Sequence, residues 1–100
     1  MVVAPSARDD LLGIWSYIAD DNVAAADRIS ERLEETFKLL GLHPHLGERC
    51  SQYGADLRHV FVDVYVIFYA VDEVARLVKV KAVIHGARDL PTELARRGLS

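Results

Sequence analysis

The sequence has little cysteine and no long apolar run. Cys50 is the single cysteine among the 100 residues, so no disulfide can form within the chain, and a reducing compartment is the usual setting for such a protein. No apolar run approaches the roughly 20 residues that a membrane-spanning helix needs. The opening stretch MVVAPSAR has neither the basic nor the apolar region of a signal peptide. We therefore expect one cytoplasmic domain that spans residues 1–100 and has no membrane segment.

An excess of positive charge is also missing. The formal net charge is −3, whereas proteins that grip a phosphate backbone usually carry a surplus of lysine and arginine. We therefore expect no tight, direct binding to nucleic acid. The charges are nevertheless uneven, because the late basic residues are Arg76, Lys79, Lys81, Arg88, Arg96 and Arg97, while the first half is rich in Asp and Glu. This asymmetry predicts two surfaces of different charge.

The sequence lacks the common motifs of metal and phosphate chemistry. It has no glycine-rich phosphate loop and no Gly-x-Ser-x-Gly motif. His43 and His45 flank Pro44, but no cysteine or glutamate accompanies them at ligand spacing, which indicates a surface loop and not a zinc site. We expect no metal and no cofactor, and we interpret Cys50 as an ordinary thiol.

The first half of the chain shows the periodicity of two amphipathic helices. Pro5 suits a first helical turn, and Ser6 followed by Asp9 resembles a capping box. Asn22 is a good N-cap for the second helix, which should end at Gly41. The apolar stripes are Leu11, Ile14, Trp15 and Ile18 in the first helix and Ala26, Ile29, Leu33, Phe37 and Leu40 in the second. The pattern predicts an antiparallel helical hairpin, with Trp15 in the core.

Residues from about Gly41 to Gly54 show no periodicity and should form a loop. After them, residues 57–62 and 65–71 have strand patterns, and Asp63 suits the tight turn between them. A second turn is expected at residues 72–75. A short helix should follow Asp89, because Pro91 stands near its start.

Alternation in the third strand assigns its side chains to two faces. Val78, Val80, Ala82 and Ile84 should face the helical hairpin, and Lys79, Lys81, Val83 and His85 should face away. Val2 and Val3 can add a short edge strand. The sequence therefore predicts an α+β fold in which an N-terminal helical hairpin packs on a three- to four-stranded antiparallel sheet, with a short C-terminal helix.

Two features are candidates for binding a partner. Tyr17 lies off the apolar stripe of the first helix, and aromatic side chains are common anchors at interfaces. Lys79 and Lys81 are two residues apart on a strand, so they should share a face and can bind RNA phosphate or an acidic peptide. Two solvated lysines on an open sheet face explain the same pattern equally well.

The stretch VIHGARDL, residues 83–90, is the sharpest candidate for a catalytic site. His85 and Arg88 can act as a general acid and a transition-state clamp in phosphodiester cleavage. In the alternative interpretation, Arg88 and Asp89 pair with neighbours while His85 hydrogen-bonds the backbone where the strand ends. The residues by themselves favour this second interpretation.

Several segments, in order along nearly the whole chain, resemble one known family. They are APSARDDLLGIWSYIADDN near the start, AAADR at residues 24–28, Pro44-x-x-Gly47, LRHVFVDVYVIFY with Arg58, Tyr65, Ile67 and Tyr69, and the closing HGARDL. Together they resemble the ParE branch of the ParE/RelE toxin superfamily, the toxin halves of bacterial type II toxin–antitoxin pairs. The resemblance implies a helical hairpin packed on an antiparallel sheet.

The resemblance also implies partners. It implies a cognate ParD-like antitoxin whose C-terminal segment wraps the toxin, and homo- or hetero-oligomers with it. ParE-like members act mainly on DNA gyrase and are not enzymes, whereas RelE-like members cut messenger RNA on the ribosome, here with Arg58, His85 and Arg88. Ala82 stands where many relatives carry an arginine, which argues against the nuclease. A non-toxic relative that only binds its antitoxin is a third alternative.

The candidate residues for partner binding can now be stated together. They are Tyr17, Arg58, Lys79, Lys81 and Arg88.

Overall fold

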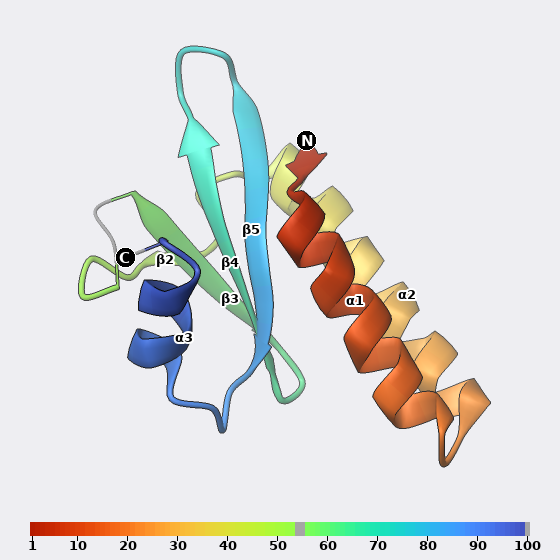
Figure 1. Ribbon diagram of the computed structural model, residues 1–100. Coiled ribbons are helices and arrows are strands. Elements are labelled where there is room, and N and C mark those ends of the chain that lie inside the picture. The colour runs from red at the N-terminus through yellow and green to blue at the C-terminus, as the bar shows by residue number, and fades with distance from the viewer. Residues whose placement is uncertain (54–55, 100) are drawn as a thin grey trace.

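The computed structural model describes residues 1–53 and 56–99, which form an α+β fold. The elements are β1 (Val2–Val3), α1 (Pro5–Ala19), α2 (Val23–Leu42), β2 (Glu48–Arg49), β3 (Leu57–Val62), β4 (Tyr65–Asp72), β5 (Leu77–His85) and α3 (Leu90–Arg96). The α1–α2 hairpin covers one face of the sheet, and α3 lies on the other face (Figure 1). The predicted fold class, hairpin and C-terminal helix are confirmed.

The sheet contains more strands than the sequence indicated. Its order is β1-β5-β4-β3-β2, so the predicted antiparallel meander of β3, β4 and β5 forms its centre. β1 pairs with β5 in parallel, with Val2 opposite Lys79. The described sheet is therefore mixed and five-stranded, whereas three to four antiparallel strands were expected.

β2 lies inside the segment that was predicted to be a loop. Glu48 pairs with His59 and Arg49 pairs with Arg58, both antiparallel. Two residues are too few to produce a periodic pattern, so pairing with β3 alone defines this strand. Gly54, the expected end of the loop, lies outside the described residues.

The helix starts follow the sequence in one case and depart from it in the other. The side chain of Asn22 accepts a hydrogen bond from the N–H of Ala25, as an N-cap should. The N-cap of α1 is Ala4, and no side chain caps this helix. The capping box expected at Ser6 is therefore wrong, because the Ser6 hydroxyl donates to the carbonyl of Lys81 at 3.2 Å and ties α1 to β5.

The turns of the meander use residues that tolerate them. Asp63 has φ of 57° between β3 and β4, in the left-handed region that the sequence predicted for it. In the next turn, the carboxylate of Asp72 accepts hydrogen bonds from the N–H groups of Val74 and Ala75. The left-handed backbone of Asp63 and the hydrogen bonds to Asp72 thus shape the two turns.

The sheet separates the core into two parts, and a β-bulge changes which side chains of β5 face each part. Tyr69 pairs with Val80 and Phe68 pairs with Ala82, which leaves Lys81 as the extra residue. The hairpin side buries Leu33, Phe37, Leu40, Ile67, Tyr69, Val78 and Val80. The α3 side buries Cys50, Leu57, Val66, Phe68, Ala82, Ile84 and Leu94. Ala82 and Ile84 therefore face α3, and the prediction that they face the hairpin is wrong.

Trp15 is not a core residue. It remains 37% exposed, and its indole Nε1 donates to the carboxylate of Asp27 at 2.9 Å, which links α1 to α2 at the surface. Among the described residues, no helix is both long enough and apolar enough to cross a membrane.

Candidate functional site

A groove of about 620 Å³ runs between α1, the end of β5 and the residues that flank α3, Arg88 and Arg97. Its α1 wall includes Gly13, Ile14 and Tyr17, and its opposite side includes His85 and Arg88. Tyr17 is 80% exposed. Three of the sequence candidates thus come together here, although they were proposed for different roles.

His85 contacts the backbone and a neighbouring ring where β5 ends. Its ring Nδ1 accepts a hydrogen bond of 3.0 Å from the N–H of Ala87, which requires an unprotonated Nδ1. The ring also packs edge-on against Tyr65, with 5.5 Å between centroids. Burial, followed by the nearby Asp63 and Tyr17, raises the pKa of Tyr65. The contact of His85 with the backbone is the one that the sequence favoured.

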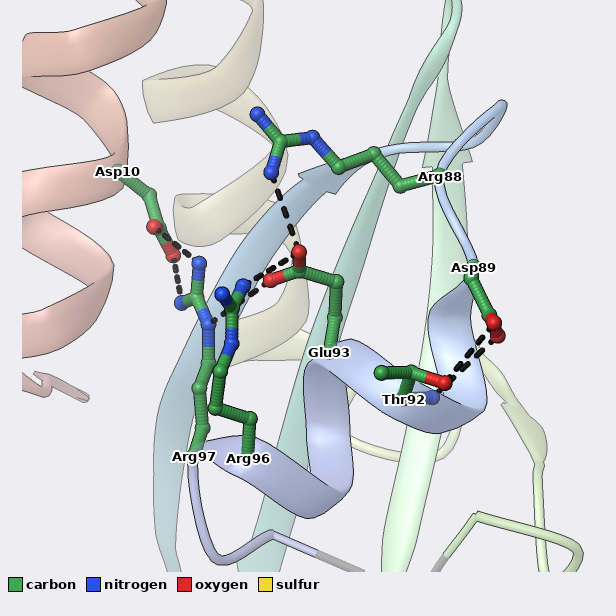
Figure 2. Close-up of polar contacts among 7 residues, drawn as sticks. All are labelled: Asp10, Arg88, Asp89, Thr92, Glu93, Arg96 and Arg97. Atoms are coloured by element: carbon green, nitrogen blue, oxygen red, sulfur yellow. Dashed lines mark hydrogen bonds and ion pairs between the residues drawn. The ribbon is translucent and has the colours of Figure 1, made fainter.

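One carboxylate joins three elements at the other end of the groove. Asp10 on α1 binds Arg97 through two hydrogen bonds of 2.7 and 2.8 Å (Figure 2). Its Oδ2 also accepts from the N–H of Val83 on β5 at 2.9 Å. Such two-pronged arginine–carboxylate bonds are among the stronger polar contacts. The bond to Asp10 raises the pKa of Arg97. Asp10 therefore fixes where α3 ends relative to α1.

Glu93 on α3 is a second carboxylate that pairs with arginines, next to the Asp10–Arg97 pair. Arg88 donates to it at 3.1 Å, and Arg96 pairs with the same oxygen (Figure 2). The bond to Arg96, with a further bond from Arg88, lowers the pKa of Glu93. Arg88 thus pairs with a neighbour, as the alternative interpretation of VIHGARDL proposed.

Local chemistry explains why α3 forms after Arg88. The Asp89 side chain accepts from the N–H of Thr92 at 3.4 Å and from its hydroxyl at 2.8 Å, which caps the helix. Pro91 stands in the first turn, and Leu94 is fully buried against the sheet. Cap, proline and buried leucine place the charged residues of α3 on the side that faces α1.

Arg58 on β3 lies outside the groove, opposite Tyr69 of β4. Its guanidinium donates to the carbonyl of Gly47 at 2.7 Å. The N–H of Gly47 donates to the hydroxyl of Tyr69 at 2.8 Å, and this hydroxyl donates to the carbonyl of Pro44 at 2.8 Å. Burial raises the pKa of Tyr69 and keeps the phenol neutral. The Pro44-x-x-Gly47 segment is thus held by Tyr69 and Arg58.

The three residues of the nuclease alternative are not brought into one site. Arg58 lies opposite Tyr69, and His85 lies opposite Tyr65. Four residues of strand separate the two tyrosines, which is roughly 13 Å at the usual rise of a strand. Arg88 joins His85 in the groove, and Arg58 does not.

A β-bulge falls between Lys79 and Lys81, the two lysines that alternation placed on one face. Lys79 lies opposite Ala70, whereas Lys81 is the extra residue of the bulge. Strict alternation is therefore interrupted between them, and their shared face cannot be inferred from a period of two. The face opposite the hairpin is also not fully open, because Leu94 of α3 packs on it.

Sequence reasoning missed Gly13, and it did not connect Asp10 with Arg97. These last two are 87 residues apart in the chain, so no local pattern connects them. Gly13 interrupts the helical pattern of α1, and this was the available signal. Across residues 1–53 and 56–99, no three side chains of His, Cys, Asp or Glu are placed to hold a metal ion together.

Comparison with known proteins identifies the family. A family model described as the ParE toxin of the type II toxin–antitoxin system, parDE, matches residues 1–90. None of the curated proteins matches the chain. The family match spans the helical hairpin and all five strands of the described sheet and reaches the first residue of α3. The chain therefore belongs to the ParE toxin family of type II toxin–antitoxin systems.

Proposed function

We propose that this toxin acts without catalysis, by binding and inhibiting DNA gyrase, and that the C-terminal segment of a ParD-like antitoxin neutralises it. The observation that carries the proposal is that each of the three candidate nuclease residues is already hydrogen-bonded within the chain. His85 bonds to the backbone of Ala87, Arg88 bonds to Glu93, and Arg58 bonds to Gly47.

Messenger RNA cleavage requires a general acid or base within hydrogen-bonding reach of the reacting group, about 2.6–3.2 Å. It also requires cations placed around the same phosphate. Arg58 and His85 are separated by four residues along β4 and by the width of the sheet between β3 and β5. The net charge of −3 also opposes approach to RNA. These features support a binding function over a nuclease.

A two-part assay tests the proposal. The purified chain is titrated into a supercoiling reaction that contains gyrase and relaxed plasmid, and in parallel into ribosomes that translate a defined messenger RNA. We expect loss of supercoiling with an intact messenger. Chain that has first been mixed with its antitoxin serves as the control and should leave gyrase active.

The alternatives give different results in the same assay. Cleavage of the messenger with unaffected gyrase would establish the RelE-type nuclease. Binding of the antitoxin with no effect in either reaction would establish a non-toxic relative. In cells, expression without antitoxin should produce filaments and a DNA-damage response, and rapid loss of messenger RNA would contradict the gyrase proposal.

Among the candidate contact residues, we assign Tyr17 and Arg88 to partner binding because both line the groove. Arg58 is engaged with Gly47. Lys79 and Lys81 are half-buried, and we propose for them only long-range attraction of an acidic antitoxin. Reversal of both lysines to Glu should slow association at low salt, and the defect should shrink at high salt.

A further inference from the structure

A second groove, of about 470 Å³, lies at the β3 edge of the sheet and shares no lining residue with the groove beside α1. Three large apolar side chains line it, Leu39 of α2, Leu46 of the segment before β2 and Phe61 of β3. Their exposed fractions are 43%, 53% and 66%, in that order. Single apolar side chains on a surface are ordinary, but exposed apolar side chains that line one groove indicate a contact surface.

The backbone of Phe61 is open to pairing at this edge. The pairing of β2 with β3 ends where Glu48 meets His59, so the rest of β3 has β4 on one side and no described strand on the other. On the β2 side, the carbonyl of Leu57 accepts from the N–H of Cys50. Backbone groups alternate between the two edges of a strand, and β3 pairs with β4 without a bulge. The N–H and C=O of Phe61 therefore point to the open side, where another strand can add.

The walls of the groove suit the alternating side chains of such a strand. Val60 packs against the core on the hairpin side, so Phe61 points to the opposite face of the sheet. The ring of Phe61 lies edge-on to His59, with 5.4 Å between centroids. Leu39 belongs to α2, which covers the hairpin side. An added strand would therefore direct one side chain toward Leu39 and the next toward Phe61.

The segment that carries Leu46 is held in place by the chain itself. The carbonyl of Gly47 accepts from Arg58 at 2.7 Å, and the N–H of Gly47 donates to the Tyr69 hydroxyl at 2.8 Å. The same hydroxyl donates to the carbonyl of Pro44 at 2.8 Å. Because this wall is already ordered, a partner that binds there does not have to offset the entropy of ordering it.

The charge at the groove favours a basic occupant. Glu48 contributes a carboxylate to the lining, and no lysine or arginine is among the described lining residues. Glu35 is exposed and lies one helical turn before Leu39, on the same side of α2. Arg32 of the same helix is paired with Asp63 at 3.5 Å, which offsets its charge. A lysine or arginine of a partner would be attracted to Glu48, and an acidic segment would be repelled.

An enzyme that handles DNA offers this chemistry, because proteins carry a surplus of lysine and arginine where they contact phosphates. The net charge of −3 on this chain is complementary to such a surface. We propose that this groove binds DNA gyrase, and that it takes an extended basic segment of the enzyme's DNA-contacting surface as an added strand beside Phe61. An apolar side chain of that segment packs on Phe61 and Leu46, and a basic side chain pairs with Glu48. The inference rests on the proposed function, because it takes gyrase as the target.

The test replaces Phe61 with threonine, which removes the ring and keeps a residue that favours strands. In the supercoiling reaction with gyrase and relaxed plasmid, the concentration of Phe61→Thr that halves supercoiling should rise at least about tenfold, as for an aromatic anchor of an interface. Its melting temperature should stay close to that of the wild type, because the side chain is 66% exposed. Its affinity for the cognate antitoxin, measured by calorimetry, should be unchanged. Val74→Thr is the control, since Val74 is 97% exposed and lies outside the groove lining, and it should inhibit gyrase as the wild type does.

Glu48→Lys tests the charge of the groove independently of the ring. It should slow association with immobilised gyrase, and the defect should shrink as the salt concentration is raised. Glu34→Lys is the matched control, because it changes the net charge by the same amount at an exposed position of α2 outside the groove lining. The defect of Glu34→Lys should be clearly smaller. Equal defects in the two variants would mean that only the overall charge matters and would overturn the pairing of Glu48.

The outcomes separate this inference from the proposed function. If the wild-type chain inhibits gyrase and Phe61→Thr inhibits it equally well, the proposed function stands and this groove is not the gyrase surface. If the wild-type chain leaves gyrase active, the proposed function fails and this inference fails with it. Loss of antitoxin binding by Phe61→Thr would assign the groove to the antitoxin, and conversion of a dimer to a monomer would assign it to a second copy of this chain. Either result would overturn the proposal.

Discussion

The two halves of β4 use tyrosine in different ways. In the second half, Tyr69 is fully buried, and its hydroxyl both accepts from Gly47 and donates to Pro44. At the start of the first half, Tyr65 lines the groove that the exposed ring of Tyr17 also lines. Around Tyr69, the hydroxyl, the N–H of Gly47 and the carbonyl of Pro44 all have hydrogen-bond partners within the chain. The Tyr65 end leaves the aromatic ring of Tyr17 exposed to solvent.

This comparison shows how to distinguish a structural position from a contact position in a small domain. At the Tyr69 end, the absence of a side chain at Gly47 is required by atoms that are already present. At the Tyr65 end, the absence of a side chain at Gly13 is required by nothing among the described residues. The same residue type therefore predicts opposite mutational effects at the two ends.

Gly47→Ala should have the largest effect on stability. Its Cβ would lie 2.6 Å from the Tyr69 hydroxyl and 2.7 Å from the carbonyl oxygen of His59, so both must move. We expect a loss of about 2–4 kcal/mol, from overpacking together with weakened hydrogen bonds to the tyrosine. The urea midpoint of unfolding measures this loss. Gly13→Ala is the opposite case and should raise the midpoint, because it replaces a glycine inside helix α1 with a better helix former. Equal midpoints for the two variants would remove the contrast between the two ends.

Tyr69→Phe tests the same end without overpacking. It deletes one hydroxyl and leaves the N–H of Gly47 and the carbonyl of Pro44 without this partner, which should cost about 1–3 kcal/mol. Tyr17→Phe is the control, since Tyr17 is exposed and a surface change of this kind stays within about 0.5 kcal/mol. Thermal unfolding of both variants provides the measurement. A Tyr69→Phe variant as stable as Tyr17→Phe would show that the loop is held in another way.

Asp10→Asn tests the polar contacts at the groove. The amide keeps an acceptor for the N–H of Val83 but loses the charge that Arg97 meets through two hydrogen bonds. We expect a loss of about 1.5–3 kcal/mol, the value of one hydrogen bond to a charged group. Asp9→Asn, on the next residue of α1, should be close to neutral. Hydrogen exchange should show faster opening of α3 in Asp10→Asn only, and equal exchange in both variants would contradict the role of Asp10.

Much of the fold could be predicted from the sequence, because its elements are encoded locally. Asn22 caps α2, the apolar run of β4 is long, and Asp63 takes the left-handed turn. The two-residue strand β2 and the bulge at Lys81 could not be predicted. Both depend on how neighbouring strands pair, and a pattern of two or three residues does not encode that pairing.

The candidate site was predictable only in part, for the same physical reason. Tyr17 and Arg88 stood out by position and chemistry, and both line the groove. The pairing of Asp10 with Arg97 joins α1 to α3 across 87 residues. Only the folded chain brings these two together, and no local pattern signals the pair. The partner surface predicted at Lys79 and Lys81 stays a prediction.

The smallest expected effect concerns the pH dependence of the α3 cluster. The pKa of Glu93 is lower in the folded state than its ordinary value of 4.5, chiefly because of its bond to Arg96. Between the folded pKa of Glu93 and its ordinary value of 4.5, the unfolded chain binds more protons than the folded chain, so the free energy of unfolding rises with pH. The contribution of Glu93 is therefore complete above pH 4.5 and is lost as the pH falls through the folded value. Melting temperatures from pH 7 to pH 3 should show wild type above Glu93→Gln at neutral pH, with the difference closing in acid. Glu34→Gln, at an exposed position of α2, should show no such closing. A difference that stays constant over the whole range would mean that the charge of Glu93 does not hold α3 in place.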